Sequence, residues 1–401
     1  MVGALRGSVL LSKFQSNSNY LKNLSIMKLP AKKSFLRSSI HLVLVSALSL
    51  FVSCGKGGDS SEESNNTDAN GSAEWWQKNQ DEGTDKKKLR IAFVTNQIAD
   101  FWNIAKAGCR DASKDLGVEI EVKMPPERSA TLQKQIVEDL VNSGIQGIAI
   151  SPLDADNQTA WLNSIAEKLH LITHDSDAPQ SNRKAYVGMD NYKAGRMCGQ
   201  LVKEALPDGG GVILFIGGMG QDNSKHRRQG VIDELFDRKR PEKLDTNNYD
   251  LDLEKVLDSG KYQIIRTILA DGQNAKAKAA DAINAYPEMK AMVGLFEYNP
   301  PGCYKALEQA EKLGEIKIIG FDENDVTLQG IKDGTITGTI VQDPYQYGYQ
   351  SAVILKSLLE GKKLEQAFID IPPRKVVRKA TKEGEVDVDE YWADLKAKKA
   401  G

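Results

Sequence analysis

The amino-acid sequence predicts an α/β protein made of two doubly wound lobes, each built around a parallel sheet. From Leu89 onward, short runs rich in Ile and Val alternate with amphipathic segments, which is the pattern of parallel strands with helices on both faces. These units are too many for one sheet, and a chain of 401 residues is long enough for two separate cores.

The apolar runs predict ten strands. They cover residues 91–95, 118–124, 147–151, 171–175, 185–189, 211–218, 262–269, 292–296, 316–322 and 337–342. Helical spacing of apolar residues fills the intervals, as at Leu132, Ile136 and Leu140. The charged stretch 239–261 is long for a helix-to-strand connection, so we interpret it as a surface insertion. Residues 381–401 are a tail in which we expect a short helix.

The N-terminal residues have the features of an export signal. Four basic side chains after Met27 precede an apolar run over residues 40–52, which is short for a membrane span and suits a signal peptide. The run ends in FVSC, which resembles a lipoprotein signal-peptidase site. We therefore expect residues 1–53 to be a signal peptide, with Met27 as an alternative start, and Cys54 to carry lipid. The alternative is a cleaved secretory signal with an incidental cysteine.

Residues 54–87 have the composition of a flexible, lipid-anchored linker. They are rich in Gly, Ser, Asn and acidic residues and contain almost no aliphatic ones. Such a segment cannot bury enough apolar surface to offset the entropy lost on ordering. Trp75 and Trp76 are the exceptions within it, and we assign them no role.

The sequence contains no motif that indicates a metal, a cofactor or a catalytic nucleophile. Cys109, Cys198 and Cys303 lie in predicted helices without CxxC spacing. Buried free thiols are the preferred interpretation, and one disulfide is the alternative. His174 and His226 lack paired ligand spacing and are interpreted as structural.

Polar and aromatic side chains follow several predicted strands at the point where each strand ends. Ligands of open parallel sheets bind beyond the carboxyl ends of the strands. The candidate ligand-binding residues are Phe101, Trp102, Asp175, Asn223, Lys225, Arg227, Asn299, Asp322 and Gln342. Flat aromatic faces can pack on the C–H faces of a sugar ring, while carboxylates and amides bond its hydroxyl groups. This combination predicts a cleft for a small, neutral, hydroxyl-rich ligand.

The order and spacing of several segments resemble the type I periplasmic binding proteins, in particular the ribose- and galactose-binding branch of ABC-transporter solute receptors. The segments are FWNIAKAGCRDASKDLG, QIVEDLVNSGIQGIAISPLDAD, LITHDSDAP, VGMDNYKAGRMCGQLV, NSKHRRQGVIDEL, GLFEYNPPGCYKAL and IIGFDENDVTLQGIKDGTITGTIVQDPYQYGYQSA. The resemblance covers residues 88–380. It implies two lobes joined by a three-crossover hinge. These are an N-terminal lobe of residues 88–189 with 343–371 and a C-terminal lobe of residues 190–342 with 372–380.

By this resemblance, Phe101 and Trp102 sandwich the sugar ring, and four polar residues bind its hydroxyl groups. The four are Asp175, Asn299, Asp322 and Gln342. The chain departs from the ribose receptor at Ala99, Ser176 and Gly272, where that receptor has Asn, Arg and Phe. The Arg on the second-lobe helix of the ribose receptor aligns with Lys225 of this chain, while Arg227 fills a position that the wider family also uses. These departures argue against ribose itself and leave a small sugar or related polyol.

Each candidate residue also has a structural interpretation. Phe101 can be a core residue, and Asp175 and Asn299 can cap turns. Lys225 or Arg227 can be a solvated helix residue. The convergence of so many polar strand ends favours ligand binding. Trp102 is favoured further because a Trp next to a Phe on a helix does not share its buried face.

These expectations describe a non-enzymatic, monomeric receptor in the periplasm or cell envelope that delivers a sugar or polyol to an ABC permease. It touches the membrane through its lipid anchor only. All 55 acidic residues follow residue 54, against 46 of the 53 basic ones, so this part is acidic and does not attract nucleic acid. The alternative is a receptor module of the same fold that feeds a sensor kinase. An exported enzyme with Asp175 and Asp322 as a carboxylate pair, and a repressor of the lactose-repressor type, are weaker hypotheses.

Overall fold

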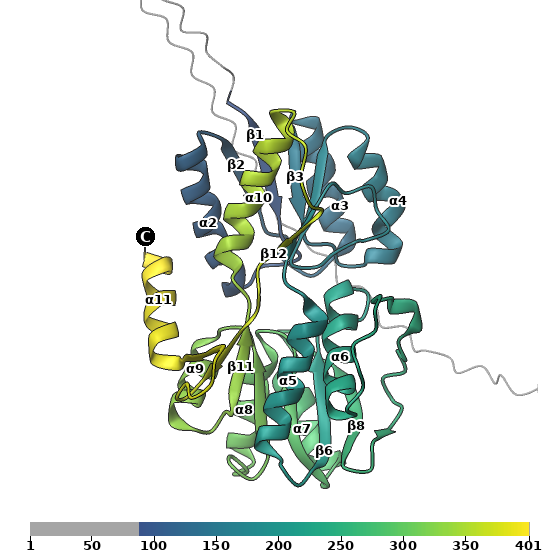
Figure 1. Cartoon of the computed structure of the whole chain (residues 1–401), viewed down its shortest axis with the longest axis vertical. Helices are drawn as coiled ribbons and strands as arrows, with labels where there is room; N and C mark the ends of the chain where they lie inside the picture. Colours follow the sequence, from purple (N-terminus) through teal and green to yellow (C-terminus); the bar gives the residue numbers. More distant parts are fainter. Residues whose placement is uncertain (1–87, 401) are drawn as a thin grey trace, which may run out of the picture. The chain divides into compact units, whose positions relative to one another are not determined.

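The N-terminal lobe is built on a six-stranded sheet in the computed structural model, which describes residues 88–400 (Figure 1). The strand order is β12-β5-β4-β3-β1-β2, and every neighbouring pair is parallel. The strands are β1 (Arg90–Val94), β2 (Glu119–Lys123), β3 (Gly147–Ile150), β4 (His170–His174), β5 (Tyr186–Gly188) and β12 (Phe368–Asp370). The helices are α2 (Asp100–Leu116), α3 (Ala130–Asn142), α4 (Ala155–Ala166) and α10 (Pro344–Leu359).

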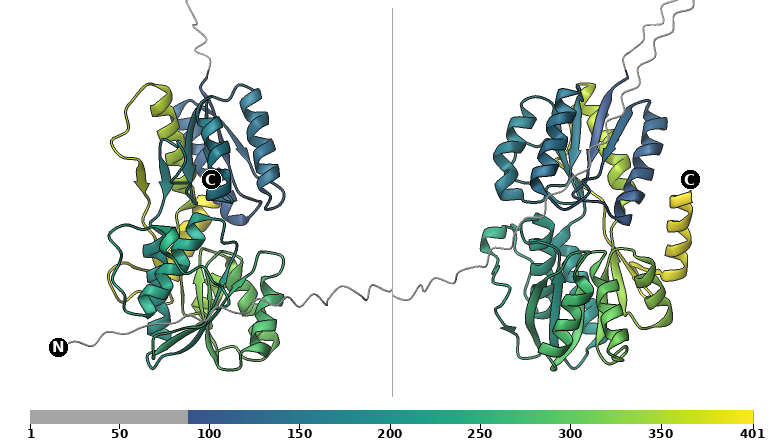
Figure 2. Two further views of the ribbon diagram at one scale, coloured as in Figure 1. Left: turned by 90° about the vertical axis from the view of Figure 1, so that its right-hand side faces the viewer. Right: turned by 180° about the vertical axis from the view of Figure 1, so that it is seen from behind.

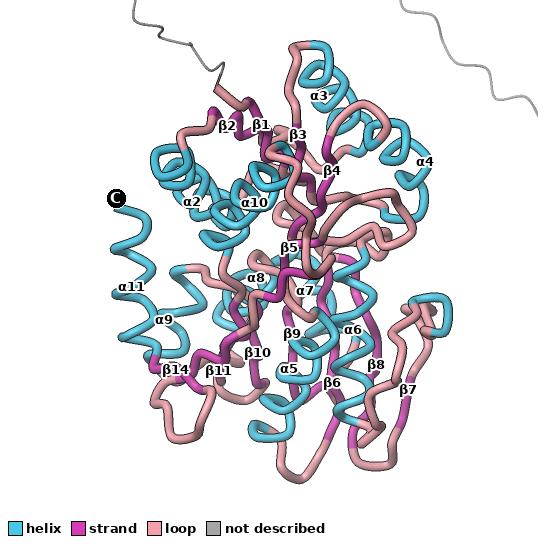
Figure 3. The backbone as a smooth tube through the Cα atoms, turned by 45° about the horizontal axis from the view of Figure 1, so that its top comes forward, coloured by secondary structure: helices cyan, strands magenta, loops and turns pink. Residues whose placement is uncertain are grey.

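Side-chain alternation along β1 divides the core of this lobe into two halves. Ile91 and Phe93 belong to the cluster beneath α2 and α10, whereas Ala92 and Val94 belong to the cluster beneath α3 and α4 (Figure 3). Successive strand residues point to opposite faces of a sheet, so a sheet covered on both faces needs apolar residues throughout. This is why the strands read as continuous Ile- and Val-rich runs.

The C-terminal lobe has an eight-stranded sheet with the order β14-β13-β11-β10-β9-β6-β8-β7. The strands are β6 (Gly210–Ile216), β7 (Leu257–Asp258), β8 (Tyr262–Leu269), β9 (Met289–Gly294), β10 (Lys317–Phe321), β11 (Gly338–Val341), β13 (Arg374–Val377) and β14 (Glu385–Asp387). The helices are α5 (Asn191–Ala205), α6 (Asp222–Leu235), η1 (Thr246–Asn248), α7 (Ala275–Ala285), α8 (Asn299–Gln309), α9 (Asp325–Asp333) and α11 (Val388–Ala400). Only the pairs β11–β13 and β7–β8 are antiparallel among these described strands.

Three short crossovers join the lobes. The chain passes between them at residues 189–190, 342–343 and 371–373, which connect β5 to α5, β11 to α10 and β12 to β13. The predicted fold class, two doubly wound lobes with a three-crossover hinge, is therefore confirmed. Because the crossovers leave the strands at their carboxyl ends, those ends of the two sheets lie on facing sides of the lobes.

The C-terminal segment is more than the tail that the sequence suggested. Residues 381–401 add β14 to the edge of the second sheet and then form α11, which runs to Ala400. Val388, Tyr391 and Leu395 of α11 are buried in the core cluster of the C-terminal lobe. The helix stands beside α9 and also contacts α2 of the other lobe (Figure 2).

The insertion at residues 239–261 lies along the opposite edge of the second sheet. Most of it has no regular structure, as expected, but it contributes η1 and the short strand β7, which pairs with β8. The amide of Thr267 in β8 also donates to the carbonyl of Leu253, 2.9 Å away. The insertion therefore covers part of the β8 edge.

The predictions for the signal peptide, Cys54, the linker and its two tryptophans lie outside the described residues. Within residues 88–400, no helix is long and apolar enough to cross a membrane. Cys109, Cys198 and Cys303 are buried free thiols, in agreement with the preferred interpretation, and burial raises the pKa of each.

Candidate functional site

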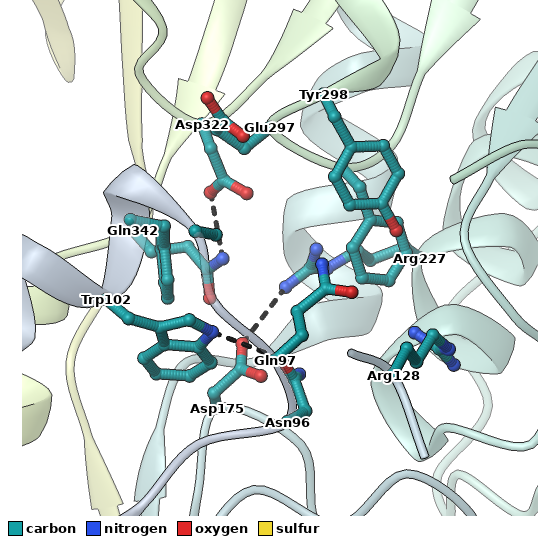
Figure 4. A pocket seen from close by; sticks show the side chains of 13 residues that line it. Asn96, Gln97, Trp102, Arg128, Asp175, Arg227, Glu297, Tyr298, Asp322 and Gln342 are labelled. Atoms are coloured by element: carbon teal, nitrogen blue, oxygen red, sulfur yellow. Dashed lines mark hydrogen bonds and ion pairs between the residues drawn. The ribbon is translucent and has the colours of Figure 1, made fainter. Parts of the chain in front are cut away.

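A narrow cavity of about 30 Å³ lies between the two lobes at the carboxyl ends of their strands (Figure 4). Its lining residues are Asn96, Gln97, Ala99, Phe101, Trp102, Arg128, Asp175, Arg227, Phe296, Glu297, Tyr298, Asp322 and Gln342. They come from the segments after β1, β2, β4, β9, β10 and β11, and from α6. The topology of the two sheets therefore assembles the site, because each of these segments starts where a buried strand ends.

Phe101 and Trp102 form an aromatic wall at the start of α2. Their side chains are 6% and 2% exposed, so the argument that neighbouring Phe and Trp side chains cannot both be buried is wrong here. The two rings have different surroundings: Phe101 meets Tyr347 edge-on at 6.4 Å, whereas Trp102 meets Phe93 at 6.2 Å and His174 at 5.4 Å. Both rings thus belong to the lobe core and to the cavity wall.

Asp175 ends β4 with a left-handed backbone, at φ 58°. Its Oδ2 accepts a hydrogen bond of 2.8 Å from Ser151 of the same lobe. Its Oδ1 faces the other lobe, 3.5 Å from Asn223 Nδ2 and 3.8 Å from Arg227 Nη2. Burial raises the pKa of Asp175, and the Arg227 guanidinium opposes that shift. One carboxylate thus reaches donors from both lobes.

Asp322 is the counterpart of Asp175 in the second lobe. It follows β10, has φ 64°, and accepts 2.8 Å from Nε2 of Gln342. The Oε1 of Gln342 in turn accepts from the Tyr347 hydroxyl at 2.9 Å. Burial raises the pKa of Asp322 as well. Left-handed backbone at a non-glycine residue is uncommon, and here it occurs at one cavity-lining strand end of each lobe.

Arg227 is fully buried, lines the cavity and forms an ion pair with Asp175 through Nη2 at 3.8 Å. Its guanidinium stacks between Phe296 and Phe321, at 4.9 and 4.1 Å from the ring centroids. Nε donates to Asn191 at 2.8 Å and Nη1 to the Leu295 carbonyl at 3.0 Å. Nη2 has no hydrogen-bond partner within the described chain. A buried donor without an acceptor is costly, so an acceptor from a ligand fits here.

The structure places the remaining candidates outside the cavity lining. Asn299 is a turn residue: it donates to the Ala270 carbonyl at 2.9 Å and accepts from the Phe296 amide at 3.1 Å. Lys225 pairs with Asp156 of the other lobe at 2.7 Å. Asn223 is buried behind Asp175, and its Oδ1 has no hydrogen-bond partner in the described residues.

Seven cavity residues were not among the candidates: Asn96, Gln97, Ala99, Arg128, Phe296, Glu297 and Tyr298. The strand-end rule points to five of them, because they directly follow β1 or β9. Arg128 carried no such signal, since it lies five residues beyond β2 in an irregular loop. Its Nη1 donates to Gln221 of the other lobe at 2.6 Å.

Within residues 88–400, no group of three or more His, Cys, Asp or Glu side chains is placed to hold a metal. The His174 ring is fully buried, stacks on Phe93 at 3.9 Å and lies 3.1 Å from the Val94 carbonyl. Burial lowers the pKa of His174 to about 3, so its ring is neutral and supports the wall behind Trp102.

Two α/β lobes that are joined by three crossovers and enclose a cavity of aromatic, carboxylate and amide groups define a two-lobe ligand-binding protein. The family model described as periplasmic binding protein domain matches residues 91–363, and the chain belongs to this family. Because its members are binding proteins, the chain is a binding protein and not an enzyme.

Comparison with known proteins gives relatives of similar length at low identity. The chain is 24% identical to the ribose import binding protein RbsB of Bacillus subtilis, over 73% of this chain and 88% of that protein. An ABC transporter solute binding protein from Burkholderia graminis, solved in complex with D-arabinose, has a TM-score of 0.65 at 24% identity, over 73% and 98% of the two chains. The structure named XylFII-LytSN complex has a TM-score of 0.62 at 24% identity, with the same coverages.

Proposed function

We propose that this chain is an extracytoplasmic receptor that captures a small sugar or polyol between its lobes and delivers it to an ABC permease. The observation that supports this most is the pairing of an aromatic wall with one strand-end aspartate from each lobe, Asp175 and Asp322. Sugar-import names among the relatives point in the same direction.

The cavity offers each part of a sugar a matching group. The Trp102 ring gives the C–H face of a pyranose or furanose an apolar contact. Asp175 and Asp322 accept hydrogen bonds from hydroxyl donors, and these charge-assisted bonds are the strong ones. Arg227 Nη2 donates to a hydroxyl or ring oxygen. The cavity of about 30 Å³ in this structure is smaller than ligand sites, which span about 300–1,000 Å³, so the lobes must separate further to hold a sugar.

Direct contacts between the lobes indicate how capture leads to closure. The Ala155 amide donates to the Gly220 carbonyl at 3.1 Å, Arg128 to Gln221 at 2.6 Å, and Lys225 to Asp156 at 2.7 Å. A ligand that bonds Asp175 and Asp322 at once binds the closed form better than the open form, and so shifts the population toward closure. Binding near −8 kcal/mol, or about micromolar affinity, is sufficient for capture and release.

The location of the receptor is part of the proposal. We propose that residues 1–53 direct export, that Cys54 carries the lipid, and that residues 54–87 tether a monomeric body to a bacterial membrane. Labelling with a radioactive or clickable palmitate tests this: the wild-type chain should incorporate label, and Cys54→Ala should not. Label in both would contradict Cys54 as the anchor.

A receptor module for a sensor kinase is the second candidate function. It is favoured by the fold similarity to the structure named XylFII-LytSN complex. Affinity purification of the tethered chain with and without sugar separates the two roles, since a permease and a kinase are different partners.

A thermal-shift screen followed by calorimetry tests the central proposal. The probes are D-ribose, D-xylose, L-arabinose, D-galactose, D-glucose and myo-inositol. At least one should raise the melting temperature and be recovered chemically unchanged. Stabilisation by amino acids or nucleotides instead, with no sugar active, would contradict the proposal.

A further inference from the structure

We propose that the cleft contains a second, outer subsite and that the physiological ligand is a neutral two-unit saccharide rather than a single sugar ring. This inference rests on the proposed sugar-binding function and concerns which members of that ligand class the cleft accepts.

The inner cavity continues into a larger chamber instead of ending at a wall. The outer chamber has a volume of about 540 Å³, against about 30 Å³ in the inner one. The residues that line both are Gln97, Ala99, Arg128, Glu297 and Tyr298. A site built for one buried ring would close at this point, whereas here the same side chains border both spaces.

Gly272 is the residue that leaves the outer chamber open. It lies between β8 and α7, and its backbone is outside the left-handed region that requires glycine. A Cβ at this position would approach only the Tyr298 side chain, at 3.9 to 4.0 Å. Neither backbone conformation nor close packing therefore requires glycine, and its effect is to leave one side of Tyr298 uncovered.

Tyr298 is suited to contact both units of such a ligand. Its ring stacks on Phe296 at 5.7 Å, and its hydroxyl is buried without a hydrogen-bond partner in the described residues. Figure 4 shows this hydroxyl directed toward the side of the cavity where Arg128 and Arg227 lie. Tyr298 lines both chambers, so its ring can contact both units of the ligand.

The chemistry of the outer chamber selects a neutral second unit. Its charged lining residues are Asp100, Glu127, Asp271, Glu297 and Arg128, so four carboxylates face one guanidinium. Carboxylates accept from sugar hydroxyls and repel a uronate or a phosphate. Gln273 and Asn324 add amide groups, and Ile98, which is 61% exposed, adds apolar surface at the rim.

Calorimetry with matched pairs of sugars tests the proposal. The pairs are xylose with xylobiose, arabinose with arabinobiose, glucose with cellobiose and maltose, and galactose with melibiose and β-1,4-galactobiose. The best disaccharide should bind at least tenfold more tightly than the best monosaccharide. Monosaccharide binding with weaker or absent disaccharide binding would overturn the outer subsite and leave the proposed function intact. No binding by any sugar would overturn both.

A variant that fills the outer chamber sharpens the test. Gly272→Phe should weaken disaccharide binding at least tenfold and change monosaccharide affinity less than twofold, whereas the matched control Gly272→Ala should leave both affinities unchanged. Equal losses for both ligands, or no loss for either, would contradict the proposal. If Gly272→Phe does not fold, Gln273→Ala serves instead, because Gln273 lines the outer chamber and not the inner one. It should weaken disaccharide binding only.

The charge of the second unit is tested with glucose 1-phosphate and galactose 1-phosphate. Each places a dianion where the second ring would lie. Both should bind more weakly than the corresponding neutral disaccharide. Tighter binding of either phosphate would contradict the assignment of a neutral second unit.

Discussion

At the scale of single residues, the two strand-end aspartates combine an uncommon backbone conformation with a carboxyl group that lines the cavity. Asp175 and Asp322 adopt φ values of 58° and 64°. Asp and Asn tolerate this region better than most residues because their short side chains bond nearby backbone. Replacement of Asp by Asn therefore changes charge while it preserves the turn.

We predict that Asp175→Asn weakens sugar binding at least tenfold. The amide removes a charged acceptor from the cavity but retains the shape of the side chain. The melting temperature should change little, because the variant also removes the desolvation of a buried carboxylate. Isothermal calorimetry and a thermal melt measure the two effects.

Asp237→Asn is the matched control. Asp237 also has a left-handed backbone, at φ 53°, but its side chain is exposed and pairs with Lys203 at 2.6 Å outside the cleft. Its substitution should leave affinity unchanged. Equal affinity of the Asp175→Asn variant and the wild type would remove Asp175 from the binding site.

We predict that Trp102→Ala lowers sugar affinity at least tenfold and also costs stability, on the order of 3–5 kcal/mol for a large buried side chain. The 2% exposure of Trp102 and its contacts with Phe93 and His174 are the reason for the second effect. Trp102→Phe separates the two, since it keeps much of the packing and removes the Nε1 hydrogen bond to Asn96. Trp161→Ala in α4 should leave affinity unchanged. Unaltered binding by both Trp102 variants would assign this residue to the core alone.

At the scale of elements, ten of the fourteen strands in the described residues were predicted, most of them because they are buried apolar runs, whereas β7, β12, β13 and β14 were not predicted. Val212, Leu214 and Ile216 of β6 face one core cluster, while Ile213 and Phe215 face the other. A strand covered on both faces therefore has apolar residues at successive positions, which makes it recognisable in the sequence.

Six of the predicted site residues line the cavity: Phe101 and Trp102 on α2, Arg227 on α6, and three residues at strand ends. Asp175, Asp322 and Gln342 were found because each directly follows a strand. Asn299 lies five residues after β9, and its amide holds the turn; the sequence cannot distinguish a turn amide from a ligand amide. Arg128 was not found because its place depends on how two distant segments meet, which spacing along the chain does not encode.

The C-terminal helix α11 was only partly predicted from the sequence. A short helix was expected in the tail of residues 381–401, but its docking against α9 and α2 depends on tertiary contacts. Lys398 of α11 lies 3.7 Å from Asp343 in a crossover between the lobes. The helix thus connects the body of the C-terminal lobe to the hinge.

We predict that Leu395→Ala destabilises the protein by about 2–5 kcal/mol, as expected for a buried leucine. Leu395 packs in the core cluster that also contains Leu328 and Ile331 of α9 and Ile104 of α2. Denaturant unfolding measures the change. Lys399→Ala, on the exposed side of the same helix, should have no effect. A Leu395→Ala variant as stable as the wild type would show that α11 contributes little to the fold.

At the scale of the whole molecule, carboxylates from both lobes meet beside the hinge. Asp222 begins α6 and is 8% exposed. Burial, followed by the nearby charge of Asp177 in the other lobe, raises its pKa to about 7, while Lys225 acts in the opposite direction. In the folded protein, the Asp222 carboxyl group therefore keeps its proton up to about pH 7, whereas in the unfolded chain it loses the proton near its ordinary pKa of 3.8.

The raised pKa of Asp222 determines how the free energy of unfolding changes with pH. Between pH 3.8 and about 7, the folded state binds more protons at Asp222 than the unfolded state does, so this contribution to stability falls as pH rises. It is fully present below pH 3.8 and lost once pH passes about 7. Removal of the carboxyl group should therefore help most at high pH.

We predict that Asp222→Asn is more stable than the wild type at pH 8, by on the order of 1–3 kcal/mol, and that the difference shrinks toward pH 5. Thermal and urea unfolding across this range measure it. Asp208→Asn, at an exposed position of the same lobe, controls for the loss of one negative charge and should show no such dependence. If the free energy of unfolding changes with pH in the same way for Asp222→Asn and the wild type from pH 5 to 8, folding does not raise the pKa of Asp222.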